Sequence, residues 1–414
     1  GDSKAVINIY DISDRENPVV EKEIEVDGSY YDARMIGDYV YVIITEYSSN
    51  IYRTMNGNVT LCIPEITIDD DTKQIPPDQI YYVDVPELSE TMTHVLSINI
   101  LDGETNQKSF MLGSSQSMYV SQNNIFLTSQ HYEYINPLED FTGGSRQTTI
   151  LHKISIDAGD ISYAAQGEVP GSILNQFSMD EHNGFFRIAT TVGSVWDGQS
   201  TNNIYILDDT LERVSEIEDI APGERIYSAR FMGGKAYLVT FKKVDPFFTI
   251  DLSDPYNPQI LGELKIPGYS DYLHPYDENH IIGIGKDTVE PDEGETWGRD
   301  FAWYQGIKIA LFDVSDFENP KEVAKIIIGD RGTDSPALYD HKAFLFDRER
   351  ELLVIPIRLC EISDEIKEQN NGDTGSIYGE ATFQGAYVYR LSLEDGFELK
   401  GRITHAEGED LGSW

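Results

Sequence analysis

Aspartate, arginine and histidine side chains that could act on a charged ligand recur at a few places in the chain, near the start of predicted strands. Two carboxylates beside a bound sugar could serve as acid and base in glycoside hydrolysis, and converging oxygens could bind calcium. Such a set could also hold a charged ligand or peptide, or its members could pair with each other and with water. The candidates, which we place at roughly equivalent positions, are Asp32, Arg34, Ser228, Arg230, Asp271, His274, Asp340 and His341.

None of these residues belongs to a motif that specifies a reaction. The segment 113–117 reads GSSQS, which lacks the second glycine of a nucleophile elbow, and no helix is predicted after it. A transition metal needs three or four converging donors, which sequence spacing does not establish. We therefore interpret each histidine as a hydrogen-bonded structural residue and leave any metal unknown.

Acidic clusters in predicted loops offer the hard oxygen ligands that calcium prefers. None of them matches an EF-hand or a glycine-rich calcium repeat, so we interpret them as solvated loops and keep calcium as the alternative. The clusters are Asp69–Asp71, Asp292 with Glu293 and Glu295, and Glu407 with Glu409 and Asp410.

Aromatic residues gather in two predicted insertions. Their rings could stack on sugar faces or anchor a protein partner, or they could form a small apolar cluster that orders the loop itself. The residues are Trp196, Trp297, Trp303 and Tyr304.

The elements that must position these side chains are repeated. One turn of pattern D-x-S-D-x-x-N-P occurs at residues 11–18, 251–258 and 313–320. Asp, Ser and Asn in such a turn cap backbone N–H groups and Pro fixes φ, so we assign these residues a structural role.

Alternating apolar and polar residues predict short strands almost everywhere, with no convincing helical period. The strands group into antiparallel units of four, which is the pattern of an all-β β-propeller. A strand pair at 5–27 is followed by six complete units whose third strands begin near Val95, Ile150, Ile204, Phe247, Ile307 and Ala386. We therefore expect one domain over 1–414, truncated at one or both ends, with seven or eight blades in the intact ring.

Long insertions join second strands to third strands. Because strand direction alternates, these connections leave the same end of each sheet as the links between units. We expect this loop-rich face to carry function. The insertions are 46–91, 131–147, 193–201, 287–305 and 359–384.

Composition excludes some partners. A formal net charge of −41 repels nucleic acid, and no apolar run is long enough to span a membrane. A signal segment is absent from the sequence as given, and Cys62 and Cys360 allow one disulfide at most.

Several long strings resemble a known family, the secreted archaeal and bacterial proteins whose β-propeller is distantly related to WD repeats. They include GSYYDARMIGDYVYVIITE, IPPDQIYYVDVPE, PGYSDYLHPYDENHIIGIGKD and YVYRLSLEDGFELKGRITH, and they extend over essentially the whole chain. The resemblance implies a propeller outside the cytoplasm, in the extracellular space or cell envelope, and implies no chemistry.

Three functional hypotheses follow. The first is a non-enzymatic protein that binds protein or glycan through the loop-rich face. The second is a calcium-dependent hydrolase or a glycan-cleaving enzyme at the mouth of the central channel. The third is a structural envelope component.

Overall fold

The structure is a computed structural model that describes residues 3–47, 52–55, 58–61, 63–82, 91–113, 115–134, 145–195, 198–241, 245–290 and 302–406. The chain divides into two compact units, one formed by residues 1–172 with 207–212 and the other by 173–206 with 213–414. The expectation of a single domain stays a prediction. Within the described ranges no helix has the length and hydrophobicity needed to cross a bilayer.

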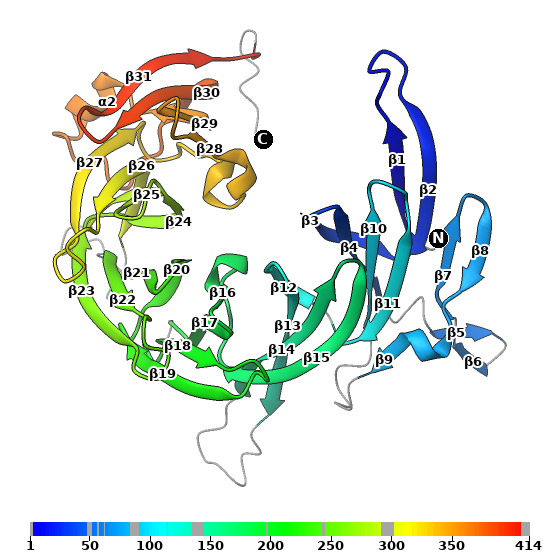
Figure 1. Ribbon diagram of the computed structural model, residues 1–414. Coiled ribbons are helices and arrows are strands. Elements are labelled where there is room, and N and C mark those ends of the chain that lie inside the picture. Colours follow the sequence, from blue (N-terminus) through cyan, green and yellow to red (C-terminus); the bar gives the residue numbers. More distant parts are fainter. Residues whose placement is uncertain are drawn as a thin grey trace. The chain divides into compact units, whose positions relative to one another are not determined.

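Unit 2 contains four sheets of four antiparallel strands, in which strands adjacent in sequence are adjacent in space (Figure 1). This order needs only hairpin connections, as the turn residues between the strands predicted. The strands are β16 (Met179–His182), β17 (Phe185–Val192), β18 (Thr201–Leu207) and β19 (Arg213–Ile220); β20 (Arg225–Met232), β21 (Lys235–Phe241), β22 (Asp245–Asp251) and β23 (Gln259–Ile266); β24 (Tyr269–Pro275), β25 (His280–Val289), β26 (Trp303–Asp313) and β27 (Lys321–Ile328); and β28 (Leu345–Asp347), β29 (Leu352–Glu361), β30 (Glu380–Ser392) and β31 (Gly396–Ile403).

Unit 1 has the same plan with three additions: the strand pair β7-β8, the strand β9 and the separate hairpin β5-β6. Its sheets have the orders β1-β2-β7-β8, β3-β4-β10-β11-β9 and β12-β13-β14-β15, beside the hairpin β5-β6. The strands are β1 (Lys4–Asp11), β2 (Val19–Asp27), β3 (Ser29–Ile36), β4 (Tyr39–Tyr47), β5 (Tyr52–Met55), β6 (Asn58–Leu61), β7 (Glu65–Ile68), β8 (Asp71–Gln74), β9 (Ile80–Tyr82), β10 (Thr91–Asn99), β11 (Thr105–Met111), β12 (Ser115–Val120), β13 (Asn124–Tyr134), β14 (Ser145–Asp157) and β15 (Asp160–Pro170).

The six complete four-stranded units expected from the sequence are confirmed, because each predicted third strand is present as β10, β14, β18, β22, β26 or β30. The strand pair predicted at 5–27 is present as β1 and β2, but its sheet contains two further strands that were not predicted. Its strand β2 pairs with β7, and β7 pairs with β8, so part of the 46–91 insertion extends this sheet at its outer edge. The alternating pattern 65–74 is too short to identify as a strand pair without knowing its partner.

The other long connections join second strands to third strands, as expected. They run from β13 to β14, from β17 to β18, from β25 to β26 and from β29 to β30, and the last contains α2 (Asp364–Gln369). Links between sheets leave the same end, so the segment 329–344 between β27 and β28 lies with the loops that follow β25 and β29.

The strand predicted around the candidates Asp340 and His341, within ALYDHKAFLF at 337–346, is mostly absent. Residues Pro336–Leu338 (η3) and His341–Ala343 (η4) form 3-10 turns, and only Leu345–Asp347 pairs with β29. Ser335 caps η3 by accepting a hydrogen bond from Ala337 N. Asp340 caps η4 by accepting one from Lys342 N. Local capping therefore outweighs the apolar alternation in this segment.

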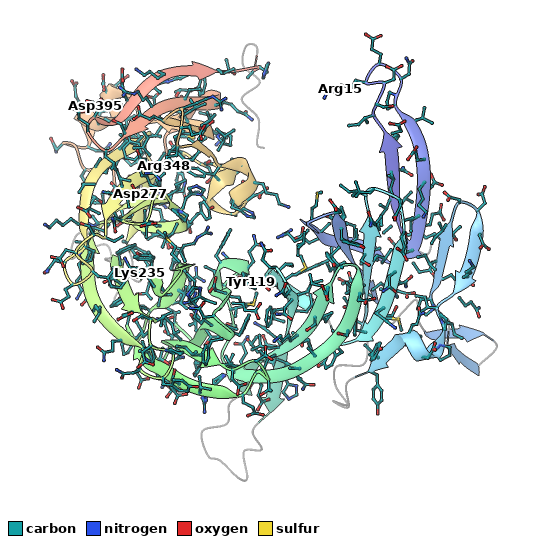
Figure 2. The ribbon with its side chains drawn as sticks, viewed as in Figure 1. Arg15, Tyr119, Lys235, Asp277, Arg348 and Asp395 are labelled. Atoms are coloured by element: carbon teal, nitrogen blue, oxygen red, sulfur yellow. The ribbon has the colours of Figure 1, made fainter. Side chains whose placement is uncertain are left out.

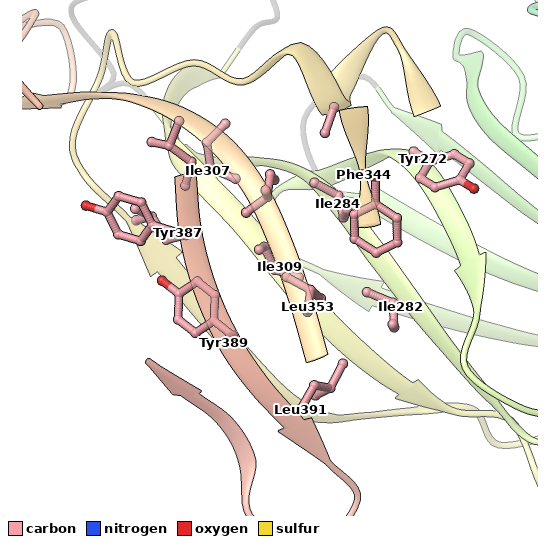
Figure 3. Packing of buried hydrophobic residues seen from close by; sticks show 14 of the residues in the cluster. Tyr272, Ile282, Ile284, Ile307, Ile309, Phe344, Leu353, Tyr387, Tyr389 and Leu391 are labelled. Carbon is pink, nitrogen blue, oxygen red and sulfur yellow. The ribbon is translucent and has the colours of Figure 1, made fainter. Parts of the chain in front are cut away.

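The sheets β24–β27 and β28–β31 pack face to face through a continuous apolar layer (Figure 3). Ile284, Ile309, Leu353 and Tyr387 are at most 2% exposed in this layer. At the end with the short turns, Arg348 and Asp277 form an ion pair of 3.4 Å (Figure 2). These contacts fix the two sheets that frame the site described below.

The D-x-S-D-x-x-N-P turns have the predicted structural role. In the third copy, Asp313 accepts a hydrogen bond from Ser315 N at 2.9 Å and Asp316 accepts one from Asn319 Nδ2 at 3.0 Å. The first copy repeats both contacts from Ser13 and Asn17. The hydrogen bonds from Ser315 hold the pKa of Asp313 below its usual value.

Substituting Asp313 by alanine is expected to destabilise the protein by about 0.5–1.5 kcal/mol, because the Ser315 N–H loses its acceptor. The pKa of Asp313 is lowered in the folded state, so its contribution is present above the unfolded pKa and is lost as pH falls through the folded value. Urea unfolding at pH 7 and pH 2.5 measures this. Asp313→Asn retains an acceptor and should lose less; an equal loss at both pH values would contradict the charge-based account.

The second and third turns also contact the preceding sheet through a backbone carbonyl. Ser215 Oγ donates to Pro255 O at 2.5 Å, and Thr249 Oγ1 donates to Phe317 O at 2.5 Å. Pro255 and Phe317 are the fifth residues of their respective turns. The same point of the turn is therefore used for docking in both cases.

Candidate functional site

A pocket of about 560 Å³ opens at the loop-bearing end of the sheets β24–β27 and β28–β31. Its wall comes from β25, β26 and β29, from the segment between β27 and β28, and from the loop before β30. The lining residues are Lys286, Tyr304, Gln305, Arg331, Gly332, Thr333, Asp334, Tyr339, Arg358 and Tyr378. Three cations therefore face one carboxylate, in a chain whose net charge is −41.

Arg331 is held between two aromatic rings. Its guanidinium carbon lies 4.6 Å from the centre of the Trp303 ring and 4.3 Å from that of Tyr378. Its Nη2 donates to Tyr378 OH at 3.1 Å, while its buried Nε has no hydrogen-bond partner in the described structure. Ring contacts of this kind orient the planar guanidinium, and Tyr378 OH uses one of the two N–H groups of Nη2.

Arg358 and Lys286 approach the pocket from the ends of β29 and β25. Arg358 pairs with Asp334 through both backbone groups, at 2.9 and 3.0 Å, and its side-chain Nε is buried without a partner among the described residues. Lys286 Nζ donates to Thr333 O and lies 3.3 Å from Asp334 Oδ1. The carboxylate of Asp334 is therefore engaged by Lys286, and neither arginine has an ion-pair partner in the described part of the chain.

Asp271 lies beside this pocket at a β-bulge. The register of β24 and β25 shifts between Ser270 and Tyr272, so Asp271 is the extra residue, a position at which strands often redirect a side chain. Burial raises its pKa to about 7, although Lys286 and Arg225 lower it. Asp334 raises it further. Perturbed carboxylates of this kind are frequent at functional sites.

Three other predicted residues of unit 2 form a separate cluster around Phe177. Arg230 lies 4.9 Å from the centre of this ring, and the His341 ring lies 5.0 Å from it. His274 Nδ1 is 3.0 Å from Tyr272 OH. Burial, with the nearby charge of Arg230, lowers the pKa of His274 to about 4, so this ring is neutral at pH 7. The interpretation of His274 as a structural histidine agrees with this packing.

The remaining candidates are dispersed. Asp340 caps η4, and in unit 1 Asp32 forms a 2.8 Å ion pair with Arg34. Asp32 follows the bulge of its strand, whereas Asp271 forms the bulge, so the two positions differ by one residue. A channel ring that includes both units stays a prediction. Trp196, Trp297 and Cys62 lie outside the described residues, and Cys360 is a buried thiol.

The aromatic candidates Trp303 and Tyr304 do lie at the pocket. Tyr304 lines it and packs on Tyr269 at 5.2 Å between ring centres, and Trp303 stacks on Arg331. Both lie on β26, which begins at Trp303, so they belong to the strand expected to begin near Ile307 and not to the predicted 287–305 insertion.

Metal binding has no support from side-chain clustering. Across the described ranges, no group of three or more His, Cys, Asp or Glu side chains is placed to hold an ion. Asp69 accepts a hydrogen bond from Glu23 N at 3.0 Å. The acidic clusters that begin at Asp292 and Glu407 lie outside the described residues, so calcium stays an untested alternative there.

The sequence analysis missed the cationic residues of the pocket, Lys286, Arg331 and Arg358, and two of its exposed tyrosines, Tyr339 and Tyr378. These come from four segments that are distant along the chain, and no single segment carries a motif. One signal was available: the link between β27 and β28 has 16 residues, 329–344, and contains Gly, Arg, Thr and Asp in the string GDRGTDS.

Two proteins from archaea and one solved structure are among those similar to this chain. A 32% identical relative, an uncharacterized protein of Methanocaldococcus jannaschii, matches 94% of this chain and 70% of its own length. An uncharacterized protein of Archaeoglobus fulgidus is 30% identical over 82% of this chain and 61% of its own. Among solved structures, the β-propeller domain of the Trilobed protease from Pyrococcus furiosus matches 92% of this chain and 96% of its own, at 8% identity and a TM-score of 0.34.

The family model described as a β-propeller domain matches residues 1–413. This match extends over the six four-stranded units and the strand pair that precedes them. The chain therefore belongs to the β-propeller domain family.

Proposed function

We propose that this protein is an extracytoplasmic binding protein that recognises a protein or glycan through its loop-rich face, with the pocket between the sheets β24–β27 and β28–β31 as its recognition site. The observation that carries the proposal is the pocket itself. Polar donors, a carboxylate and aromatic rings converge there from separate segments, as is typical of ligand sites.

Exposed rings at the pocket support recognition of a partner surface. Tyr339 is 71% exposed and Tyr378 is 67% exposed, and both line the pocket. Large aromatic side chains are enriched at binding sites because they bury much area with little loss of conformational freedom.

Replacing Tyr339 and Tyr378 together by alanine is expected to reduce binding by about tenfold or more, since each ring supplies apolar contact at the rim. The protein is applied to an array of neutral oligosaccharides, acidic oligosaccharides and peptides, and saturable binding is measured for each spot. Tyr10→Ala/Tyr256→Ala, which removes two exposed tyrosines near the D-x-S-D-x-x-N-P turns, is the matched control. If the double variant of Tyr339 and Tyr378 binds as tightly as wild type, the ligand is recognised at another site.

Glycan cleavage is a second candidate, favoured by one observation. Asp271, whose pKa is raised to about 7, can carry a proton at neutral pH, and Asp334 is a second carboxyl nearby. Acid and base roles in hydrolysis are often divided between carboxyls whose pKa values differ. The test measures whether the protein releases shortened sugars from the same array. Release by wild type that is absent in Asp271→Asn would establish cleavage as the activity.

A further inference from the structure

The pocket has more positively charged side chains than carboxylates to neutralise them. Lys286, Arg331 and Arg358 line it with the single carboxylate of Asp334. A protein with a net charge of −41 has many carboxylates available for neutralising cations. Within the described ranges, however, the buried Nε atoms of both arginines have no partner. Burying such donors without an acceptor costs free energy. Neither guanidinium has an ion-pair partner among the described residues, so an anion bound to their Nη groups would supply the missing negative charge.

The geometry around Arg331 favours a planar anion. The rings of Trp303 and Tyr378 orient the guanidinium, whose Nε is buried and whose Nη2 has one N–H engaged by Tyr378 OH. The other N–H of Nη2 and those of Nη1 can donate in parallel to the two oxygens of a carboxylate. Arg358 supplies a second guanidinium to the same pocket.

The other lining groups favour a sugar as the carrier of that carboxylate. Tyr339 and Tyr378 present exposed rings, on which the apolar face of a sugar can stack. Asp334 is an acceptor with a side chain that is 45% exposed, and sugar hydroxyls are donors that match it. An acidic peptide of Asp and Glu offers carboxylates but no hydroxylated ring that could stack on the two tyrosines.

We infer that the pocket binds a carboxylated sugar, such as a uronic acid within an acidic glycan, with Arg331 and Arg358 holding the carboxylate and the tyrosine rim holding the ring. This inference rests on the proposed function and narrows its ligand class. The pocket volume of about 560 Å³ lies within the range of small-molecule sites.

Calorimetric titration with trigalacturonate, triglucuronate and sialyllactose tests the inference. At least one should bind the wild-type protein, and its methyl ester should bind at least about tenfold more weakly because the charge-assisted hydrogen bonds are lost. Arg331→Gln and Arg358→Gln should each weaken binding by about 10- to 100-fold. Arg331→Lys keeps the charge without the planar fork and should retain an intermediate affinity.

The matched control is Arg15→Gln/Arg213→Gln. Arg15 lies in the β1–β2 turn (Figure 2) and Arg213 lies on β19, and neither residue lines the pocket, so the pair changes net charge without removing a lining residue. Less than about twofold change is expected at physiological salt, which screens exposed charges that do not contact the ligand. Circular dichroism and melting temperature confirm that each variant is folded.

The outcomes separate the inference from the proposed function. Equal binding of acid and ester, undiminished binding by both arginine variants, or no binding of any of the three acids would overturn the inference. In any of these three cases, the double variant of Tyr339 and Tyr378 is compared with wild type on the array. If the variant no longer binds a ligand that wild type binds, the proposed function stands and the pocket recognises a different class of ligand. Tetraglutamate binding as tightly as the acidic sugars would assign the pocket to a peptide and also reject the inference.

Discussion

Asp271→Asn is expected to stabilise the folded protein at pH 8 by about 1–3 kcal/mol. The carboxyl has an ordinary value of 3.8 when unfolded and a pKa of about 7 in the fold, which corresponds to at most about 4 kcal/mol. Residual access of solvent to the Asp271 carboxyl reduces this free energy. Asparagine fills the same space without a buried charge, so it avoids the cost of ionisation.

The pH dependence has a definite direction. Between about pH 4 and pH 7 the folded state holds a proton on Asp271 that the unfolded state has released, so stability falls as pH rises through this range and is level above it. The groups that act on this carboxyl are Lys286, Arg225 and Asp334. His274, whose pKa is lowered to about 4, contributes an opposite slope that both proteins share.

Urea unfolding of the wild type and Asp271→Asn at half-unit steps from pH 4.5 to pH 8 isolates the effect as a difference. Asp373→Asn, at an exposed position after α2, is the control and should differ little from wild type at any pH. A difference between Asp271→Asn and wild type that does not vary with pH would show that Asp271 is ionised throughout.

Gly306→Ala is expected to destabilise the protein by about 1–3 kcal/mol or more and to abolish ligand binding at the pocket. A Cβ at this position would lie 2.1 Å from Gly329 O and 2.4 Å from Ile328 O, and both are backbone atoms that cannot turn aside. The strands β26 and β27 would have to separate, which strains a packed sheet. The displaced Gly329 begins the segment that carries Arg331 and Asp334.

The matched control is Gly401→Ala, because a Cβ there meets no atom within 4 Å. Its stability should equal or slightly exceed that of wild type, since alanine restricts the unfolded chain. Urea unfolding and titration with the ligand found on the array measure both effects. A Gly306→Ala protein with wild-type stability and affinity would show that the two strands can part at little cost.

The sequence predicts the sheets far better than the pocket. Strand alternation and the D-x-S-D-x-x-N-P turns are local signals, so the six four-stranded units and the role of Asp313 could be read directly. The pairing of β7 with β2 depends on contacts between distant segments, and it was missed. Trp303 and Tyr304 were identified because they cluster in sequence.

Other parts of the site depend on tertiary packing. Lys286, Arg331 and Arg358 meet only because the ends of β25 and β29 adjoin the link between β27 and β28. The unusual environment of Asp271 arises from a β-bulge, in which one extra residue is inserted into a strand. No residue type in the segment marks the position of this bulge. His341 was placed on a strand because its segment alternates, whereas capping by Asp340 makes that segment a 3-10 turn.

The docking of the second and third D-x-S-D-x-x-N-P turns on the preceding sheets bears on how such a chain can grow. The hydroxyls of Ser215 and Thr249 contact main-chain carbonyls, so the fifth residue of the turn can be Pro255 in one copy and Phe317 in another. This hydrogen bond does not depend on the identity of that residue, and the ring of Phe317 adds a packing contact with Tyr237. Duplication or deletion of a whole unit therefore leaves compatible junctions behind, and the gene can change length in modular steps while its loops diverge independently.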